Sequence, residues 1–445
     1  MSFCITEYGA VADGTTNNAA AIQKAIDAAA MQGGRVVVPA GRFLSGTLVL
    51  KSNVDLHLAP GAVLISSLNP ADILDFAALF QDENACTGWD GGCFLFACHA
   101  QNVTLSGSGT LYGQGDRVFF DDNADNGAHE CPLQVTEFRP RTTFFEDVEN
   151  LTVEDITIRD AAFWTLHMAG CRHVRVRDIK ILNDVRGANN DGIDPDCCKD
   201  VMISGCLVKT GDDAIVVKST PPMTARYGGT ENVVISNCVL YSHDSALKIG
   251  TETRGDIRHV LLSDCVFRDC SRGVGIWARD GATIEDIHIH HVSGNVLKYA
   301  DGVRGHGPTM WWGNGEAVFL DATYRDARHL HPGAIRDISF DHLYLKAESC
   351  VFVAGEADAR LENITLTDLN LTLCRQGTQA PGYFDEQPSE RHVYPHTIPA
   401  VYARCVDGLR VEGRVRYMAP YTPAENPLLL TDDCTGVEAA GLLAR

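Results

Sequence analysis

The strongest constraint on the fold of this chain is a five-residue pattern that returns along most of its length. The pattern is apolar-x-apolar followed by two mostly polar or small residues, and its copies begin at Val103, Leu151, Val174, Val201, Val233, Val260, Ile287, Ile338, Ile364 and Leu409. In the central part, successive copies are 23, 27, 32, 27 and 27 residues apart. Recurrence at such intervals is typical of stacked structural repeats.

Each copy has the alternation and β-branched residues of a short strand, ends in Gly, Asn or Asp, and is not followed by a helical stretch. This combination predicts one coil of a parallel β-helix, in which inward side chains become buried by stacking on neighbouring coils. We therefore expect an all-β fold with residues 1–445 as a single solenoid domain. Cys206, Cys238 and Cys265 share one offset in the pattern, which favours an interior ladder of small side chains over metal ligation.

The open end of a solenoid exposes apolar interior and unpaired strand edges, so it requires a cap. Residues 13–33 are expected to form an amphipathic capping helix, because apolar side chains recur there at helical spacing, at Ile22, Ala25, Ile26 and Ala29. The rhythm breaks at about 74–145 and 295–331, where we expect long loops of the kind that often carry binding sites. After residue 374 we expect irregular coils with one further strand in "LRVEGRVRYM".

The composition limits the classes of molecule that the protein is expected to bind. The chain has 58 acidic and 37 basic residues, a formal charge of −21, which argues against nucleic acid or an anionic membrane as the main partner. No apolar run reaches membrane-spanning length, and no signal peptide is visible, which predicts a cytosolic protein or the mature form of an exported one. The sixteen cysteines lack C-x-x-C or zinc spacing and are expected to be reduced thiols. Oligomeric state stays open.

Two acidic segments stand out, "NNDGIDPD" from residue 189 and "GDDAI" from residue 211. Asp191 and Asp212 are 21 residues apart, about one coil, so they should meet on one face together with Asp213. Like-charge repulsion among three such carboxylates is expected to raise the pKa of at least one. A proton donor beside ionised carboxylates is suited to cleaving a glycosidic bond.

The remaining acids of the first segment receive lesser roles. Asp194 is expected to be a carboxylate of the cleft floor, and Asp196, after Pro195, to be a turn residue. A calcium loop of EF-hand type is a poor match, because the glycine of "NNDGIDPD" comes too early. We therefore expect neither a bound metal nor another cofactor.

Several segments resemble glycoside hydrolase family 28, the pectin-cleaving polygalacturonases and rhamnogalacturonases: "ITEYGAVADG", "AIQKAI", "GGRVVVPAGRF", "AAFWTLHMAGCRHVRV", "NNDGID" and "GDDAIVVKS". The resemblance covers roughly residues 5–295 and implies a right-handed parallel β-helix. It implies that Asp212 is the general acid, that Asp191 and Asp213 activate the water of an inverting displacement, and that Asn189 orients its neighbours. The implied partner is a galacturonate-containing pectic polysaccharide or oligosaccharide.

One departure from the family concerns its G-H-G segment. This segment falls on Asp244, Ser245 and Ala246, so the usual histidine is Ser245. His243 lies two residues upstream and would replace that histidine only if the loop bends differently. Otherwise we expect His243 to be an exposed turn residue.

A second departure concerns the family's R-I-K tripeptide, whose cations hold a galacturonate carboxylate. It falls on Gly275, Ile276 and Trp277. The loss of both cations removes charge-assisted hydrogen bonds to an acidic sugar. This places a rhamnogalacturonan-type or modified pectic substrate slightly ahead of plain homogalacturonan.

Nearby side chains could replace the missing contacts. Lys248 is either a ligand of the substrate carboxylate or a solvated lysine on a strand face, and further cations are Lys218, Arg254, Arg272 and Arg279. Tryptophans that could stack on sugar rings are Trp277, Trp311 and Trp312. Phe163 and Trp164 are expected in the core, while His167 is either a core residue or a cleft residue.

Two other functions compete with hydrolysis. A pectate-lyase-like enzyme would share the β-helix but would need a calcium cluster and an arginine base. A non-catalytic carbohydrate-binding β-helix is compatible with the repeats but gives no reason for three acids at this spacing. Endo and exo action are both compatible with the sequence.

Overall fold

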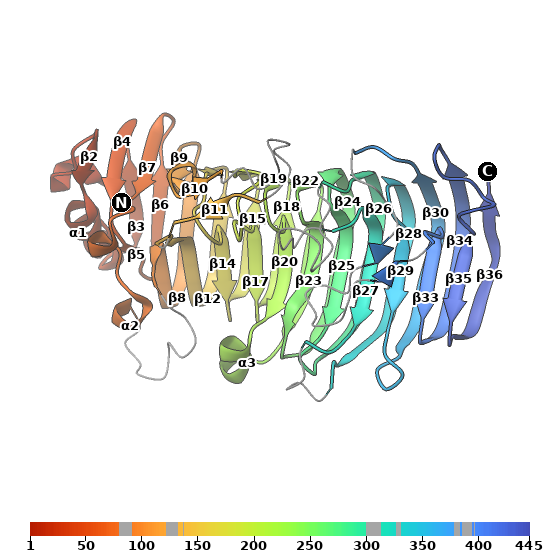
Figure 1. Ribbon diagram of the computed structural model, residues 1–445. Coiled ribbons are helices and arrows are strands. Elements are labelled where there is room, and N and C mark those ends of the chain that lie inside the picture. The colour runs from red at the N-terminus through yellow and green to blue at the C-terminus, as the bar shows by residue number, and fades with distance from the viewer. Residues whose placement is uncertain are drawn as a thin grey trace.

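The computed structural model describes residues 1–79, 91–121, 132–136, 138–299, 313–325, 331–377, 383–384, 394–395 and 397–445. The strands stack coil upon coil into one right-handed parallel β-helix that runs from the N-terminal end to the C-terminal end (Figure 1). The predicted all-β solenoid is thereby confirmed.

Within the described residues, the strand pairings form three parallel ladders. The first contains β5 (Leu48–Val49), β8 (Cys93–Gly107), β12 (Arg141–Glu154), β14 (Leu166–Ala169), β17 (Ile193–Asp196), β20 (Ile215–Ser219), β23 (Ser245–Thr253), β25 (Arg272–Ala278), β27 (Glu316–Ala322), β29 (Val351–Ala354), β33 (Val401–Arg404) and β35 (Leu429–Asp432).

The second ladder contains β1 (Ser2–Cys4), β3 (Gly34–Val38), β6 (Val54–Leu58), the later parts of β8 and β12, β15 (Arg172–Arg177), β18 (Lys199–Ser204), β21 (Thr230–Ser236), β24 (Ile257–Cys270), β26 (Thr283–Val296), β28 (Ala334–Ala347), β30 (Leu361–Leu373), β34 (Val406–Tyr417) and β36 (Thr435–Ala444).

The third ladder contains β2 (Asp13–Asn17), β4 (Gly41–Ser45), β7 (Ala62–Ser66), β9 (Thr110–Tyr112), β13 (Thr157–Arg159), β16 (Lys180–Leu182), β19 (Leu207–Thr210) and β22 (Val239–Ser242), and then the second halves of β24, β26, β28, β30, β34 and β36. Two short antiparallel pairs lie outside it, β10 (Phe119–Phe120) with β11 (Gln134–Val135) and β31 (Tyr383–Phe384) with β32 (Tyr394–Pro395).

The recurring pattern corresponds to a strand of the second ladder with a bend at each end. The fifth residue of every copy has a positive φ, at Gly107, Asp155, Asp178, Gly205, Asn237, Asp264, His291, His342, Asp368 and Gly413. The residue before each copy also has a positive φ, as at Asn102 and Asn150. Glycine, Asn, Asp and His tolerate this left-handed conformation better than other residues do, so the bends explain why these residue types punctuate the pattern.

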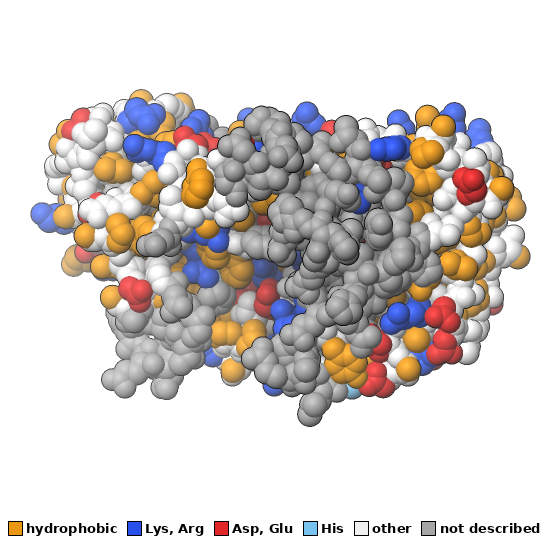
Figure 2. Space-filling view, viewed as in Figure 1, with side chains coloured by type: hydrophobic (Ala, Val, Ile, Leu, Met, Phe, Trp, Pro, Cys, Tyr) orange, Lys and Arg blue, Asp and Glu red, His pale blue; other side chains and the backbone are white. Residues whose placement is uncertain are grey.

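The first and third residues of each copy point inward. Across the described coils, the third residues form a continuous buried ladder that includes Val176, Ile203, Ile235, Leu262 and Ile289. The three aligned cysteines are buried at the side of this core, as predicted, and every cysteine in the described ranges is a free thiol. The face shown in Figure 2 carries acidic and basic side chains scattered between hydrophobic ones.

The N-terminal cap is shorter than predicted. The helix α1 spans Ala19–Ala30 and buries the four predicted apolar side chains, but residues 13–17 form strand β2, paired with β4. The Asp13 side chain accepts hydrogen bonds from the backbone N–H groups of Thr15 and Thr16 at 2.8 and 2.7 Å, which holds this segment out of the helix. The Asn18 side chain binds the Val11 backbone rather than the first helical turn.

The predicted long loops are partly wrong. Residues 93–112 and 316–322 are strands of regular coils, because "CFLFACHA" and "EAVFLDA" are buried apolar segments. The C-terminal part is more regular than expected, since β33, β34, β35 and β36 complete two further coils.

Short helices also lie between strands, against expectation. The helix α3 (Pro221–Tyr227) begins with prolines at its first turn and accounts for the longest interval between pattern copies, while α2 (Phe76–Leu79) precedes β8. The remaining helical turns are η1 (Ile5–Tyr8), η2 (Pro70–Asp72) and η3 (Gly115–Arg117). Among the described helices, none has the length and apolar character needed to cross a bilayer.

Candidate active site

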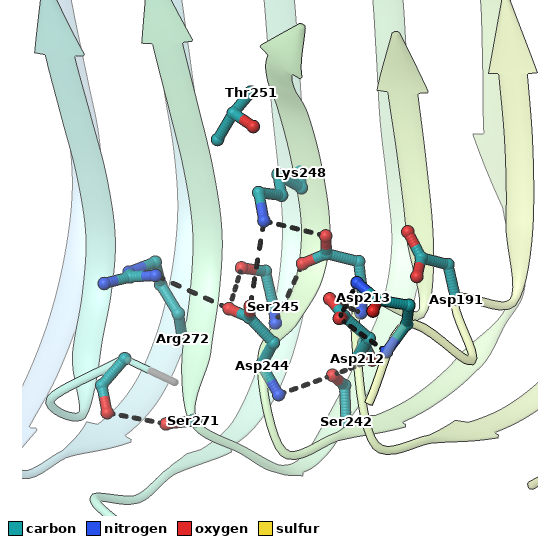
Figure 3. A network of polar contacts seen from close by, with 12 residues as sticks. Asp191, Asp212, Asp213, Ser242, Asp244, Ser245, Lys248, Thr251, Ser271 and Arg272 are labelled. Atoms are coloured by element: carbon teal, nitrogen blue, oxygen red, sulfur yellow. Dashed lines mark hydrogen bonds and ion pairs between the residues drawn. The ribbon is translucent and has the colours of Figure 1, made fainter. Parts of the chain in front are cut away.

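The acidic segments meet beside the first ladder, where the first leads into β17 and the second into β20. Gly192 donates its backbone N–H to the Asp213 carbonyl at 2.9 Å, and Ala214 donates to the Ser245 carbonyl at 2.9 Å. The turns before β17, β20 and β23 are therefore stacked on successive coils (Figure 3). One carboxylate oxygen from each of Asp191, Asp212 and Asp213 lies within 4.8 Å of the others. The predicted meeting of these aspartates is thus realised in the fold.

A cavity of about 220 Å³ opens above these carboxylates. Its lining combines acids, cations and two indole rings: Trp164, Asn189, Asp191, Asp212, Asp213, Lys218, Asp244, Lys248, Thr251, Glu252, Arg272 and Trp277. A lining with so many charged and hydrogen-bonding groups fits a carbohydrate better than an apolar ligand.

Hydrogen bonds from the backbone fix the carboxylate of Asp212. Its Oδ2 accepts the backbone N–H of Asn189 at 3.0 Å, and its Oδ1 accepts the backbone N–H of Asp213 at 3.0 Å. Asn189 is itself held in a left-handed conformation, with φ of 55°, and Arg139 donates to its side-chain oxygen at 2.8 Å. Asn189 therefore contacts Asp212 directly, where the resemblance placed an orienting residue.

The sequence reasoning missed a second asparagine. Asn190 is fully buried, and its Oδ1 accepts the backbone N–H groups of Gly211 and Asp212 at 2.8 and 3.1 Å. Its Nδ2 donates to the Asp184 carbonyl at 2.8 Å. Asn190 therefore ties the turn that carries Asp212 to the preceding coil. Its place in "NNDGID" was visible, but nothing in the sequence tells which of the two asparagines faces inward.

Asp191 is paired with Lys218. The Lys218 Nζ lies 3.2 Å from Asp191 Oδ2, 3.6 Å from Asp194 Oδ1 and 3.7 Å from Glu252 Oε2. Burial and the nearby Asp212 charge raise the pKa of Asp191 well above its usual range, although Lys218 opposes the shift. Burial would lower the pKa of Lys218, but the surrounding carboxylates raise it, so the ammonium stays charged.

Asp213 is paired with Lys248. The Lys248 Nζ lies 2.8 Å from Asp213 Oδ2 and 3.7 Å from Asp244 Oδ2 (Figure 3). Burial raises the pKa values of Asp213 and Asp244, and Lys248 works against both shifts. The Lys248 side chain is only 12% exposed, which contradicts a solvated lysine on a strand face. The raised pKa values have the expected direction, but burial is their main cause and repulsion between the carboxylates adds to it.

Two further acids of the first segment lie beneath the cavity. Asp194, on β17, is fully buried, and burial raises its pKa to about 7. Asp196 was predicted to be a turn residue, but it is a fully buried residue of β17. Its carboxylate accepts the backbone N–H and the hydroxyl of Thr220 at 2.8 and 2.6 Å, so it anchors the start of α3.

The two histidines do not line the cavity. His243 was expected to be exposed if not catalytic, but it is buried and stacks on Tyr299 with ring centroids 3.7 Å apart. Burial lowers its pKa to about 3. His167 is fully buried between Phe144 and Trp164, and burial lowers its pKa to about 4. Both imidazoles are therefore neutral at ordinary pH.

Ser245 and Trp277, at two positions where the chain departs from the family, lie in different parts of the site. Ser245 is fully buried below the cavity, where its backbone N–H donates to Asp213 Oδ1 at 3.3 Å and its hydroxyl donates to Asp244 Oδ1 at 3.0 Å. Trp277 borders the cavity but is buried, with Lys248 Nζ 5.2 Å and Arg272 Cζ 5.0 Å from its ring centre. Lys248 and Arg272 therefore lie beside the Trp277 ring, which was expected to stack on a sugar.

Trp164 was expected in the core, but it lines the cavity and is partly exposed. Lys218 Nζ lies 3.9 Å above its ring. Phe163 is also partly exposed and stacks on Trp164. The sequence shows an aromatic pair before a strand, but not which side of the coil wall the rings occupy.

The sequence indicated less about the roles of the other lining residues. Arg272 lies between Asp244 Oδ1 at 3.5 Å and Glu316 Oε2 at 3.4 Å. Glu252 had not been identified; burial would raise its pKa, but Lys218 and two further cations lower it, so it is ionised. Arg254 and Arg279 are not part of the lining, and Trp311 and Trp312 lie outside the described residues.

The three catalytic candidates also form the one group, among the described residues, whose oxygens are close enough to hold a metal ion. The ammonium groups of Lys218 and Lys248 already lie against two of the three carboxylates, at 3.2 and 2.8 Å. A divalent cation at the same oxygens would have to approach both ammonium charges. The donor set fits proton transfer better than metal binding.

Two curated proteins resemble the chain in sequence. A "Probable polygalacturonase" of Vitis vinifera is 28% identical over 68% of this chain and 63% of its own length. An "Exo-poly-alpha-D-galacturonosidase" of Dickeya chrysanthemi is 26% identical over 63% of this chain and 52% of its own length. The chain thus spans between half and two thirds of these relatives.

Solved structures share the fold. An exopolygalacturonase of Thermotoga maritima superposes with a TM-score of 0.68 at 20% identity, over 97% of this chain and 92% of its own. A family 28 exopolygalacturonase of Yersinia enterocolitica superposes with a TM-score of 0.70 at 17% identity, over 99% of this chain and 79% of its own. The model of the family "Glycosyl hydrolases family 28" matches residues 31–303, which include the whole acidic cluster. The chain belongs to glycosyl hydrolases family 28.

Proposed function

We propose that the protein hydrolyses glycosidic bonds between galacturonate units of a pectic chain. The observation that carries this proposal is the shared cavity of Asp191, Asp212 and Asp213, with oxygens within 4.8 Å of one another. Membership of family 28 and the names of the relatives support the same reaction. A non-catalytic binding protein has no need for a pair of buried carboxyls such as Asp191 and Asp213, whose pKa values are raised.

Asp212 is the proposed general acid. It gives its proton to the glycosidic oxygen as the bond between that oxygen and the anomeric carbon breaks. Asp191 and Asp213 hold a water molecule, and one of them takes its proton as the water oxygen bonds to the anomeric carbon. The sum is addition of one water across the bond, with a proton returned to Asp212 before the next turnover.

The stereochemistry follows from where the water lies. Two-carboxylate inverting enzymes usually hold their carboxyl groups about 6.5–9.5 Å apart to admit the water. In this cluster the oxygens are within 4.8 Å, which two hydrogen bonds of about 2.8 Å to one bridging water can span. With three carboxyls, the pair that holds the water is separate from the acid, so we propose inversion despite the short distance.

For the substrate we propose polygalacturonate, with rhamnogalacturonan as the second candidate. The cavity contains Lys248 and Arg272, which can meet a sugar carboxylate in place of the missing cations at positions 275 and 277. The relatives named as polygalacturonases favour the same substrate. Those altered positions, Gly275 and Trp277, are the observation that keeps rhamnogalacturonan in consideration.

The test is digestion of defined oligomers of both polymers, with NMR following the anomer released first. We expect cleavage of galacturonate oligomers with inversion, and loss of about 10²–10⁴-fold in rate for Asp212→Asn. The matched control is Asp155→Asn, at an exposed left-handed bend where asparagine is tolerated.

Three results would count against the proposal. A retained anomer would contradict the assignment of the water. An unsaturated product that disappears with a chelator would indicate a lyase. Full activity of Asp212→Asn would show that the reaction takes place elsewhere.

A further inference from the structure

A second pocket lies on another ladder of the β-helix, beginning one coil beyond the last coil of the cavity described above. Its volume is about 350 Å³, and it is formed on the third ladder by the second halves of β28, β30 and β34, at the blue end of Figure 1. Its side chains include the cations Lys346, Arg414 and Arg416 and the polar groups of Tyr344, Asn370 and Thr372. We call this pocket the basic groove.

The register of the strands arranges these side chains as two rows. Lys346 is paired with Thr372, and Thr372 with Arg416, on three successive coils. Tyr344, Asn370 and Arg414 form the parallel row two residues earlier. Because alternate residues of a strand share a face and neighbouring strands lie about 4.8 Å apart, the two rows make one flat polar surface.

The basic groove has a charge opposite to that of the molecule. The chain carries a formal charge of −21, yet the groove is lined by four basic side chains, Arg445 being the fourth, and by no acidic one. Among the described residues, no carboxylate lies within ion-pair distance of Lys346, Arg414 or Arg416. Several other exposed cations are paired, as Arg410 is with Glu412 on the same strand, at 2.6 Å.

Unpaired cations that cluster on an acidic protein attract an anion rather than stabilise the fold. The neighbouring groups indicate which anion. Tyr344 is 51% exposed, so its ring offers an apolar face to a pyranose. The Tyr344 hydroxyl and the Asn370 amide nitrogen both donate to Asp368 Oδ atoms, at 3.0 Å each, which leaves the Asn370 oxygen and the Thr372 hydroxyl as hydrogen-bonding groups for sugar hydroxyls. A sugar polymer with regularly spaced carboxylates satisfies both features.

We propose that the basic groove binds a polyuronate chain, as an accessory site that holds the polymer away from the catalytic cavity. The identity of the polymer rests on the proposed function, because the same pectic chain would supply both sites. A polymer tethered here is kept at high local concentration near the enzyme without any change at the reacting bond. The groove should therefore affect long chains and leave short oligomers unaffected.

The experiment is native gel electrophoresis through gels that contain polygalacturonate or neutral dextran. The variants are Arg414→Ala/Arg416→Ala and Lys346→Ala, made in the Asp212→Asn background so that the polymer stays intact. Arg410→Ala, on β34 outside the groove, removes one positive charge and is the matched control for Lys346→Ala. Every variant, including the double one, is compared with its own mobility in a gel without polymer. We expect polygalacturonate to slow the parent and Arg410→Ala, with roughly tenfold weaker retardation for the double variant and no effect of dextran.

Equal retardation of all variants by polygalacturonate would overturn the proposal, as would absence of retardation of the parent. Equal retardation by duplex DNA at the same charge concentration would overturn the assignment to a glycan. Kinetics on catalytically intact proteins give a second readout: the double variant should raise KM for the polymer and leave trigalacturonate unchanged. Because the gel assay needs no turnover, failure of the catalytic proposal and failure of the groove are distinguishable.

Discussion

Replacement of Lys248 by methionine tests whether this lysine keeps Asp213 ionised. The pair is 2.8 Å apart, and the two side chains are 12% and 2% exposed. At that distance the attraction is on the order of 6 kcal/mol for an effective dielectric constant of about 20. Water entering the space left by the ammonium group offsets much of this, so we expect a net loss of roughly 1.5–3 kcal/mol, or about one to two pKa units.

The direction follows from the charges. Lys248 lowers the pKa of Asp213 against burial, so its removal raises that pKa further. A carboxylate that must accept a proton from water works only above its pKa, and the acidic limb of the kcat/KM profile should therefore move to higher pH. At neutral pH the Lys248 ammonium group is charged in the parent protein. The variant Lys248→Met therefore also loses the contribution of this ion pair to the free energy of unfolding.

The assay is the pH dependence of kcat/KM on trigalacturonate between pH 3 and pH 9, with unfolding monitored by circular dichroism. Lys248→Arg, which keeps the charge, should retain most of the profile. Lys180→Met, on the exposed side of β16, is the control for loss of a lysine. An unshifted acidic limb in folded Lys248→Met would refute the reasoning.

Three other predictions concern the same molecule. Asn190→Ala removes two buried hydrogen bonds to the turn of Asp212 and should lower kcat about tenfold and the free energy of unfolding by about 1–3 kcal/mol, and an unchanged kcat would contradict the role given to this side chain. Asp264→Val places a β-branched residue at φ of 55° and should destabilise the fold by about 1–2 kcal/mol in urea titrations; an effect equal to that of Asp264→Asn would contradict the account of the bends. Added EDTA should leave the initial rate unchanged, because lysines supply the positive charge of the cluster, and a loss restored by calcium would show that a metal acts there.

The fold could be predicted because its determinants are local and repeated. Each coil requires inward apolar side chains and a left-handed residue such as Asp264 or Asn237, and both are visible as sequence letters. The start of the cap helix was misplaced because residues 13–18 are held outside the helix by the local bonds to Asp13 and also by a contact across coils, the bond from the Asn18 side chain to the Leu44 carbonyl at 3.1 Å. Such a partner is 26 residues away and leaves no mark in the helical spacing.

Part of the candidate site could be predicted because it also depends on the repeat length. Asp191 and Asp212 could be brought together because their separation is about one coil. The role of Lys248 could not be decided, because it depends on whether its ammonium group faces water or Asp213 on the coil before. Asp196 was misjudged because proline usually marks a turn, yet Pro195 lies within β17, where its register partner is Met168.

The left-handed bends have a consequence for how this molecule can change length. Equivalent bends at Asn237 and Asp264 stand one coil apart, so excision from one to the other removes a whole coil and keeps inward and outward residues in phase. Extra residues such as those of α3 lie between strands of neighbouring ladders, so they do not change which strand residues point inward. The length of the β-helix can therefore change by whole coils, while the shape of the cleft can change separately, through segments inserted between the strands.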